Sequence, residues 1–439
     1  MGSYVPNTEK DIRAMLDVIG VEKLEDLFRN IPDEVKIKGG LNLPEGKSEM
    51  EVKAIIEALA EKNKIYKSIF RGAGAYNHFI PATVGTVISK ENLLTAYTPY
   101  QAEISQGILQ SIFEYQTMIC EITGMDVSNA CVYDGGTAAA EAVKMIIGRK
   151  TEKVFVSSAL NPQYIEVIKT YCFGNGMDLV FVPEKDGVTD IDFIKENMDA
   201  TVGGVLVQNP NFYGNIEDCS TIADIVHEAK GKLVMVVNPI ASTVIKNAAE
   251  CGADVAVGEG QPLGLPISFG GPYIGFMACT DAMKRNLPGR IVGQTTDTEG
   301  KIGYVLTLQA REQHIRREKA SSNICSNEAL CALAVGVYCS IMGKKGIVEA
   351  ATLSMSKAHY MADQLAKAGL TIVNKGEFFN EFVTESKACS CDILKALDEK
   401  GILGGYPIGD NQILWCCTEC NTKEQIDCAV EIVKEVAAC

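Results

Sequence analysis

The sequence lacks a hydrophobic run that is both helical and long enough to cross a lipid bilayer. The longest uncharged run that a helix could accommodate, Ala329 to Gly343, has 15 residues, whereas a membrane helix needs roughly 20. A longer uncharged run, 260–280, contains glycines and prolines that exclude a membrane helix. The N-terminal residues also lack an apolar core of signal-peptide length. We therefore expect a cytoplasmic protein without a membrane partner.

Positive charge is also scarce. The 439 residues include 41 Lys and Arg against 56 Asp and Glu, which gives a formal net charge of −15 at pH 7. Nucleic acid and anionic membranes would repel this charge, so neither is an expected partner. The chain is too long for one compact core. Its 47% hydrophobic and 22% charged residues are typical of a globular protein.

No group of four cysteines and histidines has the spacing of a structural zinc site. The chain has 16 cysteines, of which Cys416, Cys417 and Cys420 form the only tight cluster. A second ligand pair is absent unless Cys389 and Cys391 fold across to that cluster. Because the N-terminus shows no secretion signal, we expect reduced thiols that mostly fill the core, and no metal site.

The N-terminal residues 1–68 are expected to form a helical arm. Thr8 precedes one periodic apolar run, and Ser48 with Glu51 forms a capping box before a second one. A glycine-rich loop separates the two runs. This pattern predicts two helices that lead into the main part of the chain.

Residues 69–330 are expected to form a large α/β domain. Short apolar strands alternate with helices from about residue 137 onward, which predicts a mostly parallel central sheet with helices on both faces. Two apolar helical segments, 326–342 and 346–368, follow. Residues 331–439 are then expected to form a smaller C-terminal α+β domain.

Three features of the large domain fall at the carboxyl ends of strands, where an open parallel sheet binds its ligands. Asp134 precedes a Gly-Gly-Thr sequence that opens a helix, so free N–H groups and the helix dipole could hold a phosphate there. Asn238 ends a second strand. A loop rich in glycine and proline, 258–272, follows the strand ADVAV (253–257) and contains no Lys, Arg, His or Cys.

The order of these features resembles the aminotransferase-like, fold-type I pyridoxal-phosphate enzymes. In that family the helix start holds the cofactor phosphate, an Asp pairs with the pyridine nitrogen, and a Lys in the third loop forms the Schiff base. An Asn cannot supply the negative charge, and a loop without an amine cannot form the Schiff base. The matching positions here are therefore expected to be vestigial: Gly135, Gly136, Thr137, Asn238, Gln261 and Pro262. The helix start could still bind an anion, or be filled by Glu259 or a subunit contact.

Three longer segments narrow the resemblance. They are YNHFIPATVG (76–85), a run from AYTPYQ to AEA (96–142) and REQHIRREKASSNICSNEAL (311–330). They resemble the P-protein family, the decarboxylating glycine dehydrogenase of the glycine cleavage system, over essentially the whole chain. Some members are one long polypeptide and others are two subunits with similar folds. This sequence is similar to the N-terminal half, whereas the cofactor lysine of the family lies in the other half.

The resemblance implies an enzyme, glycine dehydrogenase (aminomethyl-transferring), that is active only when this chain joins subunit 2. Subunit 2 would hold pyridoxal 5'-phosphate covalently, in an assembly with two copies of each subunit. The complex would decarboxylate glycine and pass the aminomethyl group to the lipoyl arm of H-protein. One alternative is a catalytically inactive fold-type I scaffold or regulatory subunit. Another is an independent pyridoxal-phosphate enzyme that uses Lys246 or Lys284, although neither lysine follows the required strand.

No residue of this chain is expected to be catalytic on its own, but several are expected to line a shared site. Pro99 stiffens its segment, so Tyr97 and Tyr100 could be projected at fixed angles to donate hydrogen bonds; the alternative is that both tyrosines fill an interface. His78 could be a proton shuttle or a satisfied loop histidine, and Asn77 could line a lipoyl tunnel. The expected set is Tyr97, Pro99, Tyr100, Gln101, Glu103, Asn77 and His78.

A basic run near the end of the large domain has two interpretations. It comprises Arg311, His314, Arg316, Arg317 and Lys319. It could be a salt-bridged strip at a domain or subunit junction, or a docking surface for acidic H-protein.

Overall fold

The structure, a computed structural model, describes residues 6–94, 99–148 and 151–437. The chain falls into two compact units, Met1–Lys64 and Ile65–Cys439, which we call the arm and the body. Each is described by itself. The whole stretch from 65 to 439 clusters as one unit, so a domain boundary at residue 330 stays a prediction.

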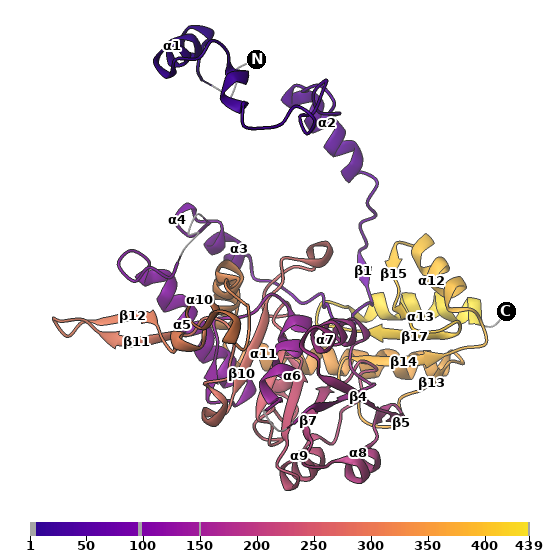
Figure 1. Ribbon diagram of the computed structural model, residues 1–439. Helices are drawn as coiled ribbons and strands as arrows, with labels where there is room; N and C mark the ends of the chain where they lie inside the picture. The colour runs from indigo at the N-terminus through magenta and orange to yellow at the C-terminus, as the bar shows by residue number, and fades with distance from the viewer. Residues whose placement is uncertain (1–5, 95–98, 149–150, 438–439) are drawn as a thin grey trace. The chain divides into compact units, whose positions relative to one another are not determined.

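The arm contains two α-helices. Helix α1 (Glu9–Ile19) begins with a capping box between Thr8 and Asp11, and α2 (Glu49–Ala60) begins with the expected box between Ser48 and Glu51. A 3-10 turn, η1 (Leu24–Phe28), lies between them (Figure 1). Of the described arm residues, only Leu16 is buried.

A seven-stranded sheet forms the centre of the body. Its strand order is β2-β10-β9-β8-β7-β3-β4, and Figure 1 labels β10, β7 and β4 of this sheet. The strands from β9 to β4 pair in parallel, while β10 is antiparallel to both β9 and β2. The strands are β2 (Val127–Ser128), β3 (Lys153–Ser157), β4 (Asp178–Val182), β7 (Val202–Asn209), β8 (Lys232–Val237), β9 (Val255–Glu259) and β10 (Gly275–Cys279).

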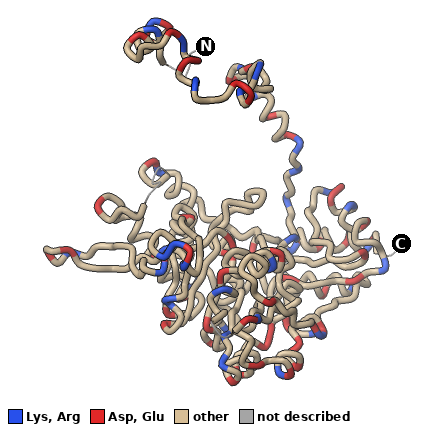
Figure 2. The backbone as a smooth tube through the Cα atoms, in the orientation of Figure 1, with Lys and Arg blue, Asp and Glu red and all other residues tan. Residues whose placement is uncertain are grey.

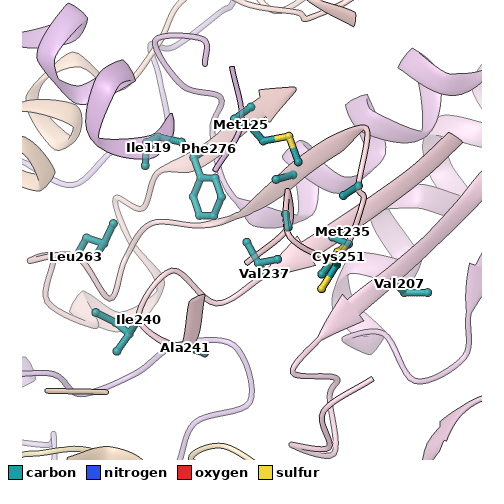
Figure 3. Packing of buried hydrophobic residues seen from close by; sticks show 14 of the residues in the cluster. Ile119, Met125, Val207, Met235, Val237, Ile240, Ala241, Cys251, Leu263 and Phe276 are labelled. Carbon is teal, nitrogen blue, oxygen red and sulfur yellow. The ribbon is translucent and has the colours of Figure 1, made fainter. Parts of the chain in front are cut away.

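Helices cover both faces of this sheet, as the sequence predicted. Alternate residues of β8 enter two different cores: Met235 and Val237 pack in one, and Val234 and Val236 in the other. Figure 3 shows part of the first core, including Met235 and Val237. Helices α5, α9 and α11 contribute to the first core, and α6 and α7 to the second. Their bounds are α5 (Gln106–Thr123), α6 (Gly135–Ile146), α7 (Pro162–Asn175), α9 (Cys219–Glu228) and α11 (Ala329–Lys367).

Helix α11 contains the two helical segments expected at 326–342 and 346–368, and a non-helical break at Gly343 separates them. The element spans 39 residues and is interrupted at Gly343, where φ is 59°, a positive value that glycine adopts without strain. Among the described helices, α11 alone has the length and composition of a membrane span, but the core helix of a globular protein passes the same test. Its first half packs in the sheet core and its second half in a C-terminal core. We therefore assign it as a core helix.

The C-terminal part of the body is built on a four-stranded antiparallel sheet of order β13-β14-β17-β16. Trp415 is fully buried between this sheet and its helices. The short strand β1 (Ser68–Ile69) pairs in parallel with β15 (Ile402–Leu403) beside it. The other elements here are β13 (Thr371–Ile372), β14 (Glu381–Glu385), α12 (Ser390–Glu399), β16 (Tyr406–Pro407), β17 (Gln412–Cys416) and α13 (Lys423–Ala437).

A long hairpin, β11 (Val292–Thr296) with β12 (Ile302–Leu306), was not expected from the sequence. It projects from the body in Figure 1, and Tyr304 at its base packs against Phe113 of α5. The remaining short elements are α3 (Ala82–Ile88), α4 (Glu91–Leu94), β5 (Glu184–Lys185), β6 (Val188–Thr189), α8 (Ile191–Asn197) and α10 (Gln313–Arg316).

Candidate functional site

The start of helix α6 lies at the carboxyl edge of the sheet, as expected, but side chains of the chain itself occupy it. Asp134 caps the helix, and its Oδ1 accepts a hydrogen bond from the Thr137 amide at 2.7 Å. The Gly135 amide donates to Glu259 Oε2 at 2.9 Å. Gly136, which lies between Gly135 and Thr137 in the sequence, is also buried. The amides that could have held a phosphate therefore already face carboxylates.

Glu259 ends strand β9 and accepts hydrogen bonds from three separate backbone amides. Besides Gly135, its Oε1 accepts from Gln261 at 2.9 Å and from Ile274 at 3.1 Å. Burial raises the pKa of Glu259 to about 7, while the three backbone hydrogen bonds oppose that rise. Of the two fillers considered for the helix start, the structure places Glu259 there.

Tyr164 of α7 closes the remaining space. A Cβ on Gly135 would overlap Tyr164 Oη, and would lie 2.8 Å from Tyr164 Cζ and 3.0 Å from Glu259 Cβ. The cavity left here measures about 30 Å³ and is bordered by Tyr164, Asn238, Glu259 and Pro262. Small-molecule pockets typically measure about 300–1,000 Å³, whereas this space suits about one or two waters. The residues present do not fit a pyridoxal phosphate.

Asn238 and Gln261 are engaged in structural hydrogen bonds. Asn238 Oδ1 accepts from the amides of Ile240 at 2.9 Å and Ala241 at 3.3 Å, which forms the turn after β8. Gln261 is buried; its Oε1 accepts from the Tyr76 amide at 2.8 Å and its Nε2 donates to the Tyr76 carbonyl at 3.0 Å. Neither side chain supplies an amine or a negative charge.

The two lysines considered for a Schiff base lie elsewhere. Lys284 follows a short 3-10 turn and pairs with Asp281 at 2.6 Å. Lys246 borders a separate cavity of about 660 Å³ between α5 and α11. Neither lysine lines the small cavity beside Glu259.

A second cluster forms around Tyr100, one of the residues expected at a shared site. The Tyr100 hydroxyl hydrogen-bonds the Asn327 side chain and accepts from the Asn327 amide at 3.2 Å. The Arg290 guanidinium carbon lies 4.9 Å from the centre of the Tyr100 ring, a cation–π contact. Arg290 in turn pairs with the buried Glu312. The segments 96–142 and 311–330, far apart in sequence, thus meet here.

Three buried polar atoms of this cluster have no hydrogen-bond partner within the described chain. They are Arg311 Nε, Glu312 Oε1 and Asn327 Nδ2. Arg311 uses another nitrogen to donate to the Gly289 carbonyl at 2.7 Å. Buried polar groups are almost always paired in folded proteins. These atoms are therefore candidates to meet a water, a ligand or a second chain.

Glu328 connects the Tyr100 cluster to the start of α6. Its amide donates to Cys131 Sγ at 3.0 Å. Burial, and then the charge of Asp134, raise the pKa of Glu328 to about 7. A carboxyl group with such a pKa can take up or release a proton near neutral pH. The sequence patterns did not single out Arg290, Asn327 or Glu328, although Asn327 and Glu328 lie in the segment 311–330.

His78 is buried away from solvent in contact with the C-terminal sheet. Its Nδ1 lies 2.7 Å from Glu419 Oε2, and Thr418 Oγ1 donates to the Asn77 carbonyl at 2.7 Å. Burial raises the pKa of Glu419, but hydrogen bonding and the charge of His78 outweigh this and lower it. His78 Nε2 has no partner among the described atoms. The structure thus gives His78 a buried contact with the Glu419 carboxylate at hydrogen-bond distance, and a proton-transfer role stays a prediction.

The other expected residues around position 100 differ in exposure. Pro99 is buried, whereas Gln101 and Glu103 are exposed. The Gln101 carbonyl accepts from the amides of Ile104 and Ser105 and so begins the turn before α5. Tyr97 lies outside the described residues.

The basic run divides into an inner and an outer part. Arg311 is half-buried, while His314, Arg316, Arg317 and Lys319 are exposed. Figure 2 shows Lys and Arg positions gathered around α10. Among the described ion pairs, His314 lies 3.7 Å from Glu312 and none involves Arg316, Arg317 or Lys319. Within the described residues the outer part thus contributes one ion pair, at His314, and both a salt-bridged strip at a subunit junction and a docking surface for H-protein stay predictions.

The cysteine cluster does not gather into a four-ligand site within the described residues. Cys416 and Cys417 are buried in the C-terminal part of the body. Cys389 and Cys391 form a disulfide with each other at the start of α12, which corrects the expectation that every thiol is reduced. These two cysteines lie next to Asp392, but sulfurs that are bonded to each other do not offer thiolates to a metal.

Comparisons with known proteins show the family to which this chain belongs. The family model "Glycine cleavage system P-protein" matches residues 2–433. The "Probable glycine dehydrogenase (decarboxylating) subunit 1" of Geobacillus sp. (strain WCH70) is 49% identical over 446 residues and covers 99% of both chains. The protein of the same name from Lysinibacillus sphaericus (strain C3-41) is 48% identical and covers 97% of both.

Solved structures agree with the expected fold class. A crystal structure of glycine decarboxylase (P-protein) of the glycine cleavage system, in inhibitor-bound form, is 40% identical with a TM-score of 0.92, covering 99% of this chain and 100% of that chain. A sphingosine-1-phosphate lyase of Burkholderia pseudomallei K96243 is 12% identical with a TM-score of 0.67, covering 93% and 94%, and shows the fold alone. The fold-type I architecture is thereby confirmed.

Proposed function

The chain belongs to the glycine cleavage system P-protein family, and from that premise we propose that it is the cofactor-free subunit of a two-subunit glycine dehydrogenase. In this proposal a second subunit of similar fold holds pyridoxal 5'-phosphate covalently. Two copies of each subunit assemble in the cytoplasm, decarboxylate glycine and pass the aminomethyl group to the lipoyl arm of H-protein. The relatives that support it are named subunit 1, which implies a second subunit.

The contact between Glu259 and the start of α6 carries the proposal. A carboxylate with three amide donors fills the place that a cofactor phosphate takes in this fold. The loop after β9 has Gln261 where the fold supplies a lysine. A chain that fills its own phosphate position and lacks the amine requires another chain to bring the cofactor.

The Tyr100 cluster is the part of this chain that we propose faces the shared site. Tyr100, Arg290 and Asn327 hold one another in place from three separate segments. Arg311, Glu312 and Asn327 keep buried polar atoms for a further partner. A guanidinium and a phenol can orient a carboxylate substrate, and the neighbouring Glu328 can exchange a proton near pH 7.

The test compares the isolated chain with the co-expressed complex. The isolated chain should show no yellow absorbance after incubation with pyridoxal 5'-phosphate, and borohydride should trap no adduct on it. The complex should exchange labelled bicarbonate with the glycine carboxyl group in the presence of H-protein, and borohydride should trap the cofactor on the second subunit alone. A pyridoxyl-lysine in a digest of this chain would refute the proposal. Full exchange activity of the second subunit alone would favour the scaffold alternative.

A further inference from the structure

A buried carboxyl group in the middle of helix α6 keeps one oxygen without a partner. The Glu141 residue is 2% exposed, and its Oε1 has no hydrogen-bond partner within the described chain. Burial raises the pKa of Glu141, and hydrogen bonding by Ser322 and the charge of Lys144 oppose that rise only in part. Because buried polar groups are nearly always paired, this oxygen indicates a donor that comes from outside the chain.

The Glu141 side chain borders a cavity of about 170 Å³. Met145 and Pro288 form part of its buried wall, whereas Asn286 and Ser321 are exposed and open it to solvent. An engineered protein cavity of about 150 Å³ holds benzene, a ligand of about six non-hydrogen atoms. The cavity beside Glu141 therefore suits a molecule of about the same size.

Lys144 brings the opposite charge to the same cavity. It lies three residues after Glu141 on α6 and also borders the cavity. Residues three apart lie on one face of a helix. Among the described ion pairs, none involves Lys144. A cavity that offers both a carboxyl oxygen and an unpaired ammonium group matches a ligand with one group of each charge.

We propose that this cavity binds a small zwitterionic amino acid of about five to seven non-hydrogen atoms, such as glycine, alanine or serine. The ammonium group of the ligand donates to Glu141 Oε1, and its carboxylate accepts from Lys144, so that a charge-assisted hydrogen bond forms at each end. Met145 and Pro288 leave room for a short side chain only.

A simple anion fits the small cavity less well, because Glu141 would repel it. Lys144 also borders a wider cavity of about 440 Å³, which Arg317 and Tyr171 line as well. An anion without an ammonium group would find two cations there, Lys144 and Arg317. The combination of Glu141 with Lys144 in the small cavity is therefore what selects a zwitterion.

The cavity is separate from the residues proposed to face the shared site. None of Tyr100, Arg290 and Asn327 borders it. Amino acid binding here is thus additional to the function proposed above and does not depend on it.

Ligand-detected NMR titration of the isolated full-length chain tests the site, because in the function proposed above this chain alone cannot turn glycine over. Glycine, alanine or serine should bind with a dissociation constant of about 10 mM or lower. Acetate and methylammonium each carry one of the two charged groups and should bind at least about tenfold more weakly. No saturable binding of the three amino acids would mean that water alone fills the cavity, and equal binding of acetate would mean a simple anion site. Either result overturns the proposal.

Substitutions identify the cavity. Glu141→Gln removes the charge at nearly constant volume, and Lys144→Met removes the ammonium group but keeps most of the aliphatic stem. Each should weaken amino acid binding at least about tenfold. Lys169→Met is the matched control, because Lys169 pairs with Glu166 on the exposed side of α7 and borders neither cavity; it should change the affinity less than about twofold. Unchanged affinity in both test variants would overturn the proposal.

Thermal unfolding checks that each variant is folded. Lys144 is only half-buried, so Lys144→Met keeps the test available if Glu141→Gln does not fold.

A variant of the Tyr100 cluster separates the two sites. Tyr100→Phe should leave amino acid binding to the isolated chain unchanged. Loss of binding in Tyr100→Phe together with wild-type binding in Lys144→Met would place the amino acid at the shared site and overturn the proposal. Binding that depends on Lys144 would stand even if the co-expressed complex showed no bicarbonate exchange, so the two proposals fail separately.

Discussion

The amide of Gly135 and the carboxylate of Glu259 lie 2.9 Å apart although 124 positions separate them in the chain. This hydrogen bond closes the start of α6, where free helix N–H groups could otherwise bind a phosphate group. It is the most informative contact in the body, because it shows that the chain supplies its own anion. The first prediction tests whether a phosphate ion can take the place of the Glu259 carboxylate at this helix start.

Removal of the Glu259 carboxylate should create a phosphate site. Glu259→Ala leaves three buried amides unpaired and should lower the free energy of unfolding by about 2–4 kcal/mol. Millimolar inorganic phosphate should restore part of that loss, because the helix start then offers free N–H groups. Urea unfolding of the variant and the wild type, with chloride at equal ionic strength as control, measures both effects. Equal phosphate effects on both proteins would contradict the interpretation.

Close packing at the helix start predicts a difference between two neighbouring glycines. Gly135→Ala should destabilise the protein by about 1–3 kcal/mol, because the new Cβ would overlap Tyr164. Gly136→Ala is the control: its Cβ would lie 3.3 Å from Val167, and alanine favours helix. Thermal unfolding should show a lower Tm for the first variant only. Tyr164→Phe in the Gly135→Ala background should recover part of the loss.

Buried Glu381 predicts how stability depends on pH. Its Oε2 accepts from the Tyr76 hydroxyl and its Oε1 from the Ala73 amide, each at 2.7 Å. Burial raises the pKa of Glu381 to about 7, so the folded state binds a proton that the unfolded state releases near pH 4.5. This stabilisation is present at low pH and is lost as the pH rises through about 7.

The Glu381→Gln variant measures that contribution. The wild type should lose up to about 3 kcal/mol through this group between pH 5 and pH 8, and the variant should show a correspondingly shallower decline. Urea unfolding at several pH values gives the slope. Glu385→Gln, on the same strand but exposed, is the control and should leave the slope unchanged. A steeper decline in Glu381→Gln would reverse the predicted sign.

The Tyr100 cluster predicts a loss of turnover without a loss of assembly. Tyr100→Phe removes the hydroxyl that holds Asn327 and should lower the turnover of the assembled enzyme about tenfold. Gel filtration should show an intact complex. Tyr304→Phe, on the hairpin beside Phe113, serves as the matched control and should retain turnover. Wild-type turnover in Tyr100→Phe would remove this cluster from the shared site.

Thiol labelling should distinguish the Cys389–Cys391 pair from the other exposed cysteines. Cys325 and Cys428 are free and exposed, so a maleimide should modify both without reductant. Cys389 and Cys391 should react only after reduction, because their sulfurs are bonded to each other. Peptide mapping by mass spectrometry identifies the labelled positions. Labelling of Cys391 before reduction would show that the pair is a dithiol in solution.

Local patterns in the sequence predicted much of the fold. Apolar runs of strand length predicted six strands of the central sheet, β3, β4, β7, β8, β9 and β10, because buried strands need continuous hydrophobic residues. Thr8 and Ser48 marked two helix starts correctly, because capping depends on neighbours only three residues away. Glycine at position 343 correctly marked the break between the two helical segments of α11, because its positive φ interrupts the helix there.

The site was harder to predict because its contacts join distant segments. Tyr100 was singled out from its sequence, but its partners Arg290 and Asn327 come from segments about 190 and 227 positions away. No local pattern reports such a pairing. Glu259 was named as a possible filler of the helix start, whereas Tyr164, which closes the remaining space, carries no signal within α7 itself.

The self-supplied carboxylate at the start of α6 also has a nutritional consequence. In the function proposed above, a second subunit alone holds the cofactor, so this polypeptide needs no vitamin B6 to mature. Cells deprived of the vitamin should therefore accumulate this subunit in native form, ready for its companion once the coenzyme returns.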